Sequence, residues 1–134
     1  MKHLIPPLTL ALFLIRLLLN AQEPPPRLAP PPGMKSYFLV LISAEGDAKS
    51  LVMSPEGKAL FAEHRTFIGR QLAAKNYLLA GPVTDSGPLS GVAVAAARDE
   101  KEAREWEEAD PLVKSGKFRF EVHAVLLQSL DVLK

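Results

Sequence analysis

Cysteine is absent from this 134-residue chain, which excludes disulfides, thiolate nucleophiles and thiolate metal sites together. The sequence also lacks a glycine-rich phosphate loop and the HExxH spacing of zinc proteases. Its 16 basic and 15 acidic residues are nearly balanced, and no basic patch is interleaved with aromatic residues. Nucleic-acid binding therefore has no support, and we expect no cofactor.

The start of the chain has the layout of a secretory signal peptide. Residues 1–3 are short and basic, residues 4–19 are strongly apolar, and Ala21 is a small residue at the expected cleavage position. The sequence predicts a signal peptide over residues 1–21, export to the periplasm or the exterior, and no stable membrane insertion after cleavage. An uncleaved anchor is one alternative, and a start at Met34, which would leave the protein in the cytoplasm, is another.

Residues 22–33 hold six of the twelve prolines and are predicted to be a polyproline II linker. From Met34 to Lys134 the composition becomes that of a folded domain. The expected strands cover residues 36–43, 77–80, 91–98 and 118–127. The expected helices cover residues 55–75, capped by Ser54, and 99–109, followed by a helical turn that Gly116 ends.

The resulting order, βαββαβ, predicts an α+β fold of the ferredoxin-like type, an antiparallel four-stranded sheet with both helices on one face. The first strand is apolar on both sides, since Tyr37, Leu39 and Leu41 alternate with Phe38, Val40 and Ile42. Leaving one side in water would expose a large apolar patch. We therefore predict a homodimer with two sheets packed face to face; partial cover by the C-terminal residues is the alternative.

His64 lies within the apolar stripe of the first long helix. With Leu60 at 0° and about 100° per residue, His64 falls at about 40°, between the directions of Phe67 and Ile68, and Leu72 lies at about 120°. An imidazole directed at the core needs a hydrogen-bond partner, which then governs its protonation. The position alone fits a core histidine as well as a working one.

Asp110 is the second polar residue of interest. Asp110, Pro111 and Gly116 together describe a capped helical turn completely, which favours a structural role for the aspartate. The histidines offer little to a metal, because zinc sites normally use three or four protein ligands. With only His64 and His123 outside the signal, we expect no metal.

Four short segments resemble the YCII-related protein family. They are YFLVLI in the first strand, Phe61-Ala62-Glu63-His64, Ala80-Gly81-Pro82, and Trp106-x-x-Ala109-Asp110-Pro111 followed by Gly116. The resemblance covers residues 34–134 and implies small ferredoxin-like dimers of the dimeric α+β barrel type. It also implies that His64 and Asp110 form the active-site pair, and that relatives act on small cyclic compounds, as a dehydrochlorinase of chlorinated hydroxyquinols and muconolactone isomerases do.

Elementary chemistry agrees with such a pair. A carboxylate that accepts from one ring nitrogen fixes the tautomer, so the other nitrogen can take a proton from a carbon acid or a phenol. Proton transfer or elimination on a small-molecule ligand, in a pocket between helix and sheet, is the predicted function. A non-catalytic ligand-binding or assembly module, with the same pair as a buried strut, is the alternative.

Four further residues are candidates for substrate binding. Arg65 would clamp an anion, although its place at the edge of the stripe favours a solvated arginine. Gly81 and Pro82 would line the pocket or simply end a strand, and Ser86 would contact ligand or form a turn.

The remaining notable side chains are expected to be structural. His123 lies on the sheet face assigned to the dimer, and Trp106 should pack the second helix on the sheet. Glu105, Glu107 and Glu108 are expected to be solvated helix charges.

Overall fold

The structure is a computed structural model that describes residues 29–128. The predicted signal peptide and most of the predicted linker lie outside these residues. Four strands form one antiparallel sheet in the order β2-β3-β1-β4. They are β1 (Met34–Ala44), β2 (Tyr77–Pro82), β3 (Leu89–Ala95) and β4 (Phe118–Gln128). This order confirms the predicted ferredoxin-like α+β fold.

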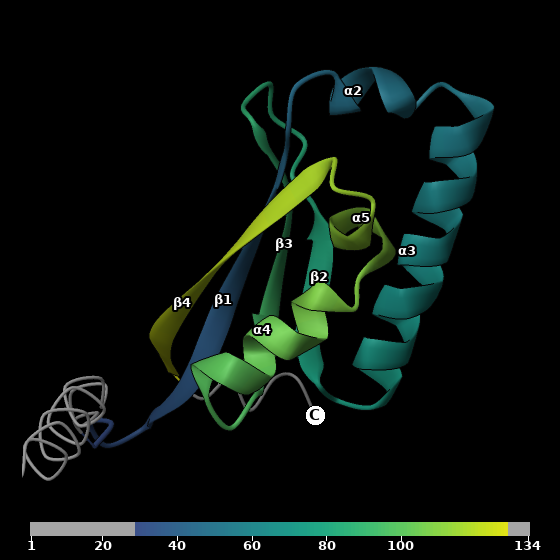
Figure 1. The fold of residues 1–134 in the computed structure, drawn as a ribbon. Helices are drawn as coiled ribbons and strands as arrows, with labels where there is room; N and C mark the ends of the chain where they lie inside the picture. The colour runs from purple at the N-terminus through teal and green to yellow at the C-terminus, as the bar shows by residue number, and fades with distance from the viewer. Residues whose placement is uncertain (1–28, 129–134) are drawn as a thin grey trace, which may run out of the picture.

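The helices lie on one side of the sheet, as Figure 1 shows. They are α2 (Ala48–Leu51), α3 (Pro55–Ala73), α4 (Glu100–Glu108) and α5 (Pro111–Lys114). The long helix α3 contacts α5 and β2, while α4 contacts β4. Only two residues separate α4 from α5, and α5 contacts both α3 and β4.

Both predicted helix starts are confirmed by their caps. Ser54 Oγ accepts from the Gly57 N–H at 3.0 Å, and Asp99 Oδ1 accepts from the Glu102 N–H at 2.8 Å. These bonds satisfy N–H groups that a helix leaves unpaired at its first turn.

Several predicted boundaries differ from the structure by a few residues. The helix α3 ends at Ala73 rather than Lys75, because Lys75 adopts a left-handed φ of 59°, and the N–H of the predicted stop Asn76 bonds back to the Gln71 carbonyl at 3.0 Å. The turn at Gly81 and Pro82 belongs to β2, and β3 begins at Leu89 and ends at Ala95. The sequence also gave no sign of α2, which has no side-chain cap.

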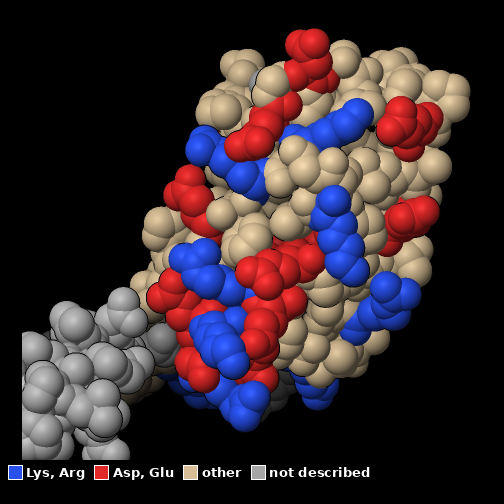
Figure 2. Space-filling model, in the orientation of Figure 1, with Lys and Arg blue, Asp and Glu red and all other residues tan. Residues whose placement is uncertain are grey.

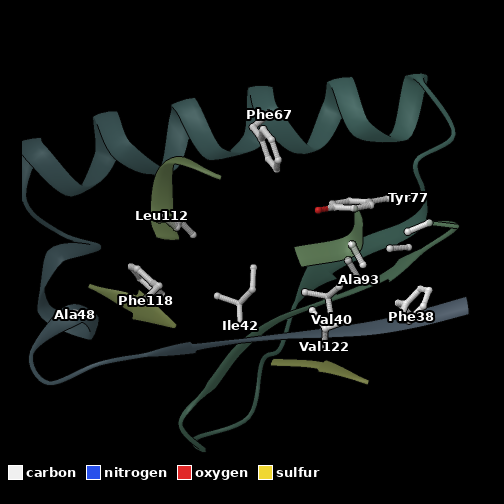
Figure 3. Close-up of a cluster of buried hydrophobic side chains, with 13 residues drawn as sticks. Phe38, Val40, Ile42, Ala48, Phe67, Tyr77, Ala93, Leu112, Phe118 and Val122 are labelled. Carbon is white, nitrogen blue, oxygen red and sulfur yellow. The ribbon is translucent and has the colours of Figure 1, made fainter. Parts of the chain in front are cut away.

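The core fills the space between α3 and the sheet. Phe38, Val40 and Ile42 point from β1 toward the helices, and Phe67 points down from α3 to meet them (Figure 3). Phe61 adds an edge-on contact with Phe118, with ring centroids 5.8 Å apart. These side chains occupy the space in which the sequence predicted a pocket.

The opposite face of the sheet carries no helix. Its central cross-strand row joins Leu79, Val94 and Leu39, and it continues to His123 on β4. Leu79 is 43% exposed, and Leu39 is only partly covered. We call this surface, formed by Tyr37, Leu39, Leu41, Leu79, Val92, Val94 and Val125, the open sheet face.

Charged side chains of both signs are intermixed over α4 (Figure 2). Ion pairs four residues apart join Arg98 to Glu102, Arg104 to Glu100 and Lys101 to Glu105. This side of the molecule therefore has no basic patch over α4. Within residues 29–128, no helix is long and apolar enough to cross a membrane.

Candidate active site

His64 projects from the middle of α3 toward the last short helix. Its side chain remains 19% exposed, and it lies between the partly buried Leu60 and Ile68 on one side of α3. The expected apolar stripe is thus present, except for its last predicted member: Leu72 is 38% exposed.

Asp110 is completely buried at the start of α5. Its Oδ1 accepts from the Leu112 N–H at 2.8 Å, which is the predicted N-cap. Pro111 occupies the first helical position, and Gly116, with a φ of 71°, follows the last turn. The short helix therefore holds the carboxylate in one place.

The two predicted partners meet. Nδ1 of His64 lies 2.8 Å from Oδ2 and 3.0 Å from Oδ1 of Asp110. An ionised carboxylate can only accept, so Nδ1 carries the hydrogen in this bond. In the neutral ring Nε2 then has a free lone pair, and no hydrogen bond found among residues 29–128 uses it. The arrangement can therefore take up a proton at Nε2, with the charge stabilised by Asp110.

A second buried acid lies beside this pair. The prediction that Glu107 is a solvated helix charge was wrong, since its side chain is fully buried. The Tyr77 hydroxyl donates to its Oε1, whereas Oε2 has no hydrogen-bond partner within the described part of the chain. Burial raises the pKa of Glu107 to about 7; the negative charge of Asp110 adds to this, while the Tyr77 bond and His64 oppose it.

Tyr77 itself is buried at the start of β2. Burial, followed by the neighbouring Glu107, raises the pKa of its phenol above the ordinary value. Its ring packs against Trp106 at 6.2 Å between centroids, and Trp106 covers the core as expected. The burial of Glu107 could have been predicted from the sequence. Its position follows the spacing of one helix face, together with Ala103, Trp106 and Asp110.

The other candidate residues are not joined to the His64–Asp110 pair by any observed hydrogen bond. Arg65 is exposed on α3, as a solvated arginine would be, and Gly81 and Pro82 pair with Val92 and Gly91 in the sheet. Ser86 lies in the exposed loop between β2 and β3. Their role in substrate binding remains a prediction.

Two of the hollows on the described surface lie on the helices. One lies over α4, and the other lies between α3 and the start of α5, lined by Ala62, Glu63, Thr66, Arg70 and Pro111. Neither is lined by His64. No group of three possible metal ligands occurs among residues 29–128. A ligand would therefore have to reach His64 through the exposed part of the ring.

The order of the strands, the one-sided helices and the His64–Asp110 pair define a ferredoxin-like α+β protein with a potential acid-base site. The chain belongs to the YCII-related domain family, whose domain matches residues 37–125. No curated protein matches the chain in sequence.

Among solved structures, the chain is similar to 5-chloro-2-hydroxyhydroquinone dehydrochlorinase from Burkholderia phenoliruptrix AC1100, in complex with 2,5-dihydroxybenzoquinone. The two share 17% sequence identity and a TM-score of 0.48, over 70% of this chain and 93% of the other. At this distance the likeness does not extend to activity.

Proposed function

We propose that this YCII-related protein is an acid-base enzyme that acts on a small cyclic or aromatic compound by proton transfer or elimination. The observation that carries the proposal is the contact between a fully buried Asp110 and a partly exposed His64. A buried carboxylate paired with an accessible imidazole is suited to removing a proton from a bound ligand.

In this proposal, Nε2 of His64 takes a proton from a carbon or hydroxyl group of the substrate. The electron pair of that bond then forms a double bond, and in an elimination the leaving group departs as an anion with its own electron pair. Asp110 keeps the ring in place and stabilises the imidazolium. The histidine later returns the proton to product or solvent.

One observation favours a second candidate function. Only a fifth of the His64 side chain is exposed, and the two hollows on the helices do not include it. A non-catalytic binding or assembly module would use the same pair as a strut between α3 and α5. In that case, replacement of His64 would chiefly lower stability, by about 1–3 kcal/mol for an orphaned buried partner.

Turnover of a small panel separates these candidates. The panel contains phenols, lactones and chlorinated hydroxyquinols, including the chlorinated hydroxyhydroquinone of the structural neighbour. We expect wild type to consume at least one compound and His64→Ala to lose at least about 100-fold of that rate, the lower range for a general base. His123→Ala, an exposed histidine on the other face, is the matched control. If His64→Ala turns the compound over at the wild-type rate, the proposed catalytic role of His64 is contradicted.

We also propose that the protein is exported and forms a homodimer through the open sheet face. The support for export is the signal pattern of residues 1–21 alone. The support for the dimer is the apolar row of Leu39, Val94 and Leu79, which no helix of residues 29–128 covers. Val94 is already buried in the single chain, and Leu79 is 43% exposed.

Sedimentation tests the dimer. Leu79→Glu places a charge on the open sheet face at a position that a single chain leaves 43% exposed, so it should convert a dimer to monomers without unfolding. Met53→Glu, at a site that is 78% exposed beside α2, should leave the dimer intact. A monomeric wild type at micromolar concentration contradicts the proposal.

A further inference from the structure

Two fully buried carboxyl groups lie at the junction of α4 and α5. Glu107 is in the last turn of α4, Asp110 caps α5, and the Asp110 N–H donates to the Glu107 carbonyl at 2.9 Å. The backbone thus fixes the two residues relative to each other. Asp110 has partners for both carboxylate oxygens, whereas Glu107 has one for Oε1 only.

The unpaired oxygen indicates which form of Glu107 the fold tolerates. An ionised carboxylate buried with one oxygen unsatisfied loses its hydration without full replacement, and a second negative charge lies close by at Asp110. Neutral Glu107 loses less hydration free energy on burial, and it is not repelled by the charge of Asp110. It also retains the bond with Tyr77, whose hydroxyl can donate or accept.

We propose that Glu107 is a positioning residue of the His64–Asp110 pair, a buried acid that shares a hydrogen bond with Tyr77 and, by gaining or losing one proton, sets how much negative charge surrounds the imidazole. The catalytic meaning of this role rests on the proposed function. The electrostatic coupling itself does not.

The groups that face Glu107 come from three elements. Tyr77 donates to it from β2, and Asp110 lies three residues on at the start of α5. His64 reaches the same place from α3 through its bond to Asp110. Among the other charged side chains of α4, Glu102 is partly buried and pairs with Arg98. The rest are exposed; they are Glu100, Lys101, Arg104, Glu105 and Glu108. The buried cluster therefore contains two acids, one phenol and one imidazole.

Within this cluster, proton binding at His64 and at Glu107 must be linked. A charged imidazolium favours ionised Glu107, and ionised Glu107 equally favours the imidazolium. When His64 accepts a proton from a substrate, Glu107 releases its own more readily. The acid therefore limits the net charge change that the buried site undergoes during proton transfer.

Titration of the His64 ring by NMR tests the coupling without any substrate. In the full-length protein we expect the His64 signal to follow two overlapping steps, one of them belonging to Glu107. Glu107→Gln should leave a single step, displaced to lower pH, because ionised Glu107 favours the imidazolium. Glu108→Gln, the same change at an exposed neighbour, should keep the wild-type curve.

A Glu107→Gln curve that superimposes on wild type would overturn the proposal, because a purely structural role predicts no change in titration. The result is independent of turnover. If the protein consumes no panel compound but shows the coupled titration, the proposed function is contradicted and the coupling is supported. If it consumes a compound but shows no coupling, the proposed function is supported and the coupling is contradicted.

Tyr77→Phe provides a second route if Glu107→Gln does not fold. It removes the hydrogen bond that favours ionised Glu107, so the carboxylic-acid C=O band of Glu107 in the infrared spectrum should persist to higher pH than in wild type. The second step of the His64 curve should move in the same direction. An infrared band and a histidine curve both unchanged from wild type would overturn the proposal.

Discussion

The carboxylate of Asp110 holds Nδ1 of His64 at 2.8 Å while it caps the helix that begins with Pro111. One side chain thereby joins α3 to α5 and orients the imidazole. The cap supplies the rigidity that a proton-transfer site needs, since its geometry is fixed by the backbone N–H of Leu112. Asp110 is therefore both the cap of α5 and the residue that orients the His64 ring.

Replacement of Asp110 should therefore cost more than an ordinary cap. Asp110→Ala leaves the Leu112 N–H and His64 without their partner, and we expect the free energy of unfolding to fall by about 2–4 kcal/mol. Asp110→Asn keeps an acceptor for the cap and should lose less. Urea denaturation measures both.

The control for this series is Asp85→Ala, which removes an exposed bond to the Gly87 N–H. Surface changes of this kind usually stay within about 0.5 kcal/mol. If Asp110→Ala proves no more damaging than the control, Asp110 does not hold α5 and α3 together.

Two glycines of α3 should respond in opposite ways to alanine. A Cβ at Gly57 would lie 1.7 Å from the Leu51 carbonyl oxygen, so Gly57→Ala must displace the α2–α3 connection. A Cβ at Gly69 meets nothing within 4 Å, and Gly69→Ala should stabilise the helix by about 0.5–1 kcal/mol. Thermal unfolding of both variants tests the close approach of Gly57 to the Leu51 carbonyl. Equal changes in Tm for the two variants would contradict that approach.

The free energy of unfolding should depend on pH through the protonation of Glu107. Its pKa is raised from 4.5 to about 7 on folding, so between these values the folded state holds a proton that the unfolded state has released. Raising the pH across this window therefore destabilises the fold, by up to about 3 kcal/mol. Glu107→Gln cannot lose a proton and should gain stability relative to wild type over the same range.

Urea unfolding at a series of pH values measures this difference. The exposed Glu108→Gln variant should run parallel to wild type throughout. A constant difference between Glu107→Gln and wild type from pH 5 to about 8 would show that Glu107 is ionised in the folded state over the whole window.

Most of the fold followed from local patterns. Runs of β-branched, aromatic and other apolar residues placed all four strands, and the caps Ser54 and Asp99 placed both long helices to within two residues. The short α2 was not foreseen, because packing rather than a capping side chain defines it. The end of α3 was placed two residues too late, because a left-handed lysine is rarely signalled by sequence.

The candidate site was predicted unevenly. The helical stripe directed His64 inward, but its meeting with Asp110 was implied only by the resemblance to the YCII-related family, because the capped D-P turn by itself favoured a structural aspartate. Glu107 was missed, since a run of charged residues suggests a solvated face; only the helix periodicity with Ala103 distinguishes the buried member. The pocket between helix and sheet stays a prediction, and aromatic side chains such as Phe38 and Phe67 pack in the core there.

The most direct test of the central claim is nitrogen NMR of the His64 ring at about pH 8, above the ordinary histidine range. Our account predicts the hydrogen on Nδ1, bonded to Asp110, and an unprotonated Nε2 whose signal moves when a panel compound binds, while the exposed His123 does not respond. A hydrogen on Nε2, or an Nε2 signal that no compound perturbs, would contradict an acid-base role for His64.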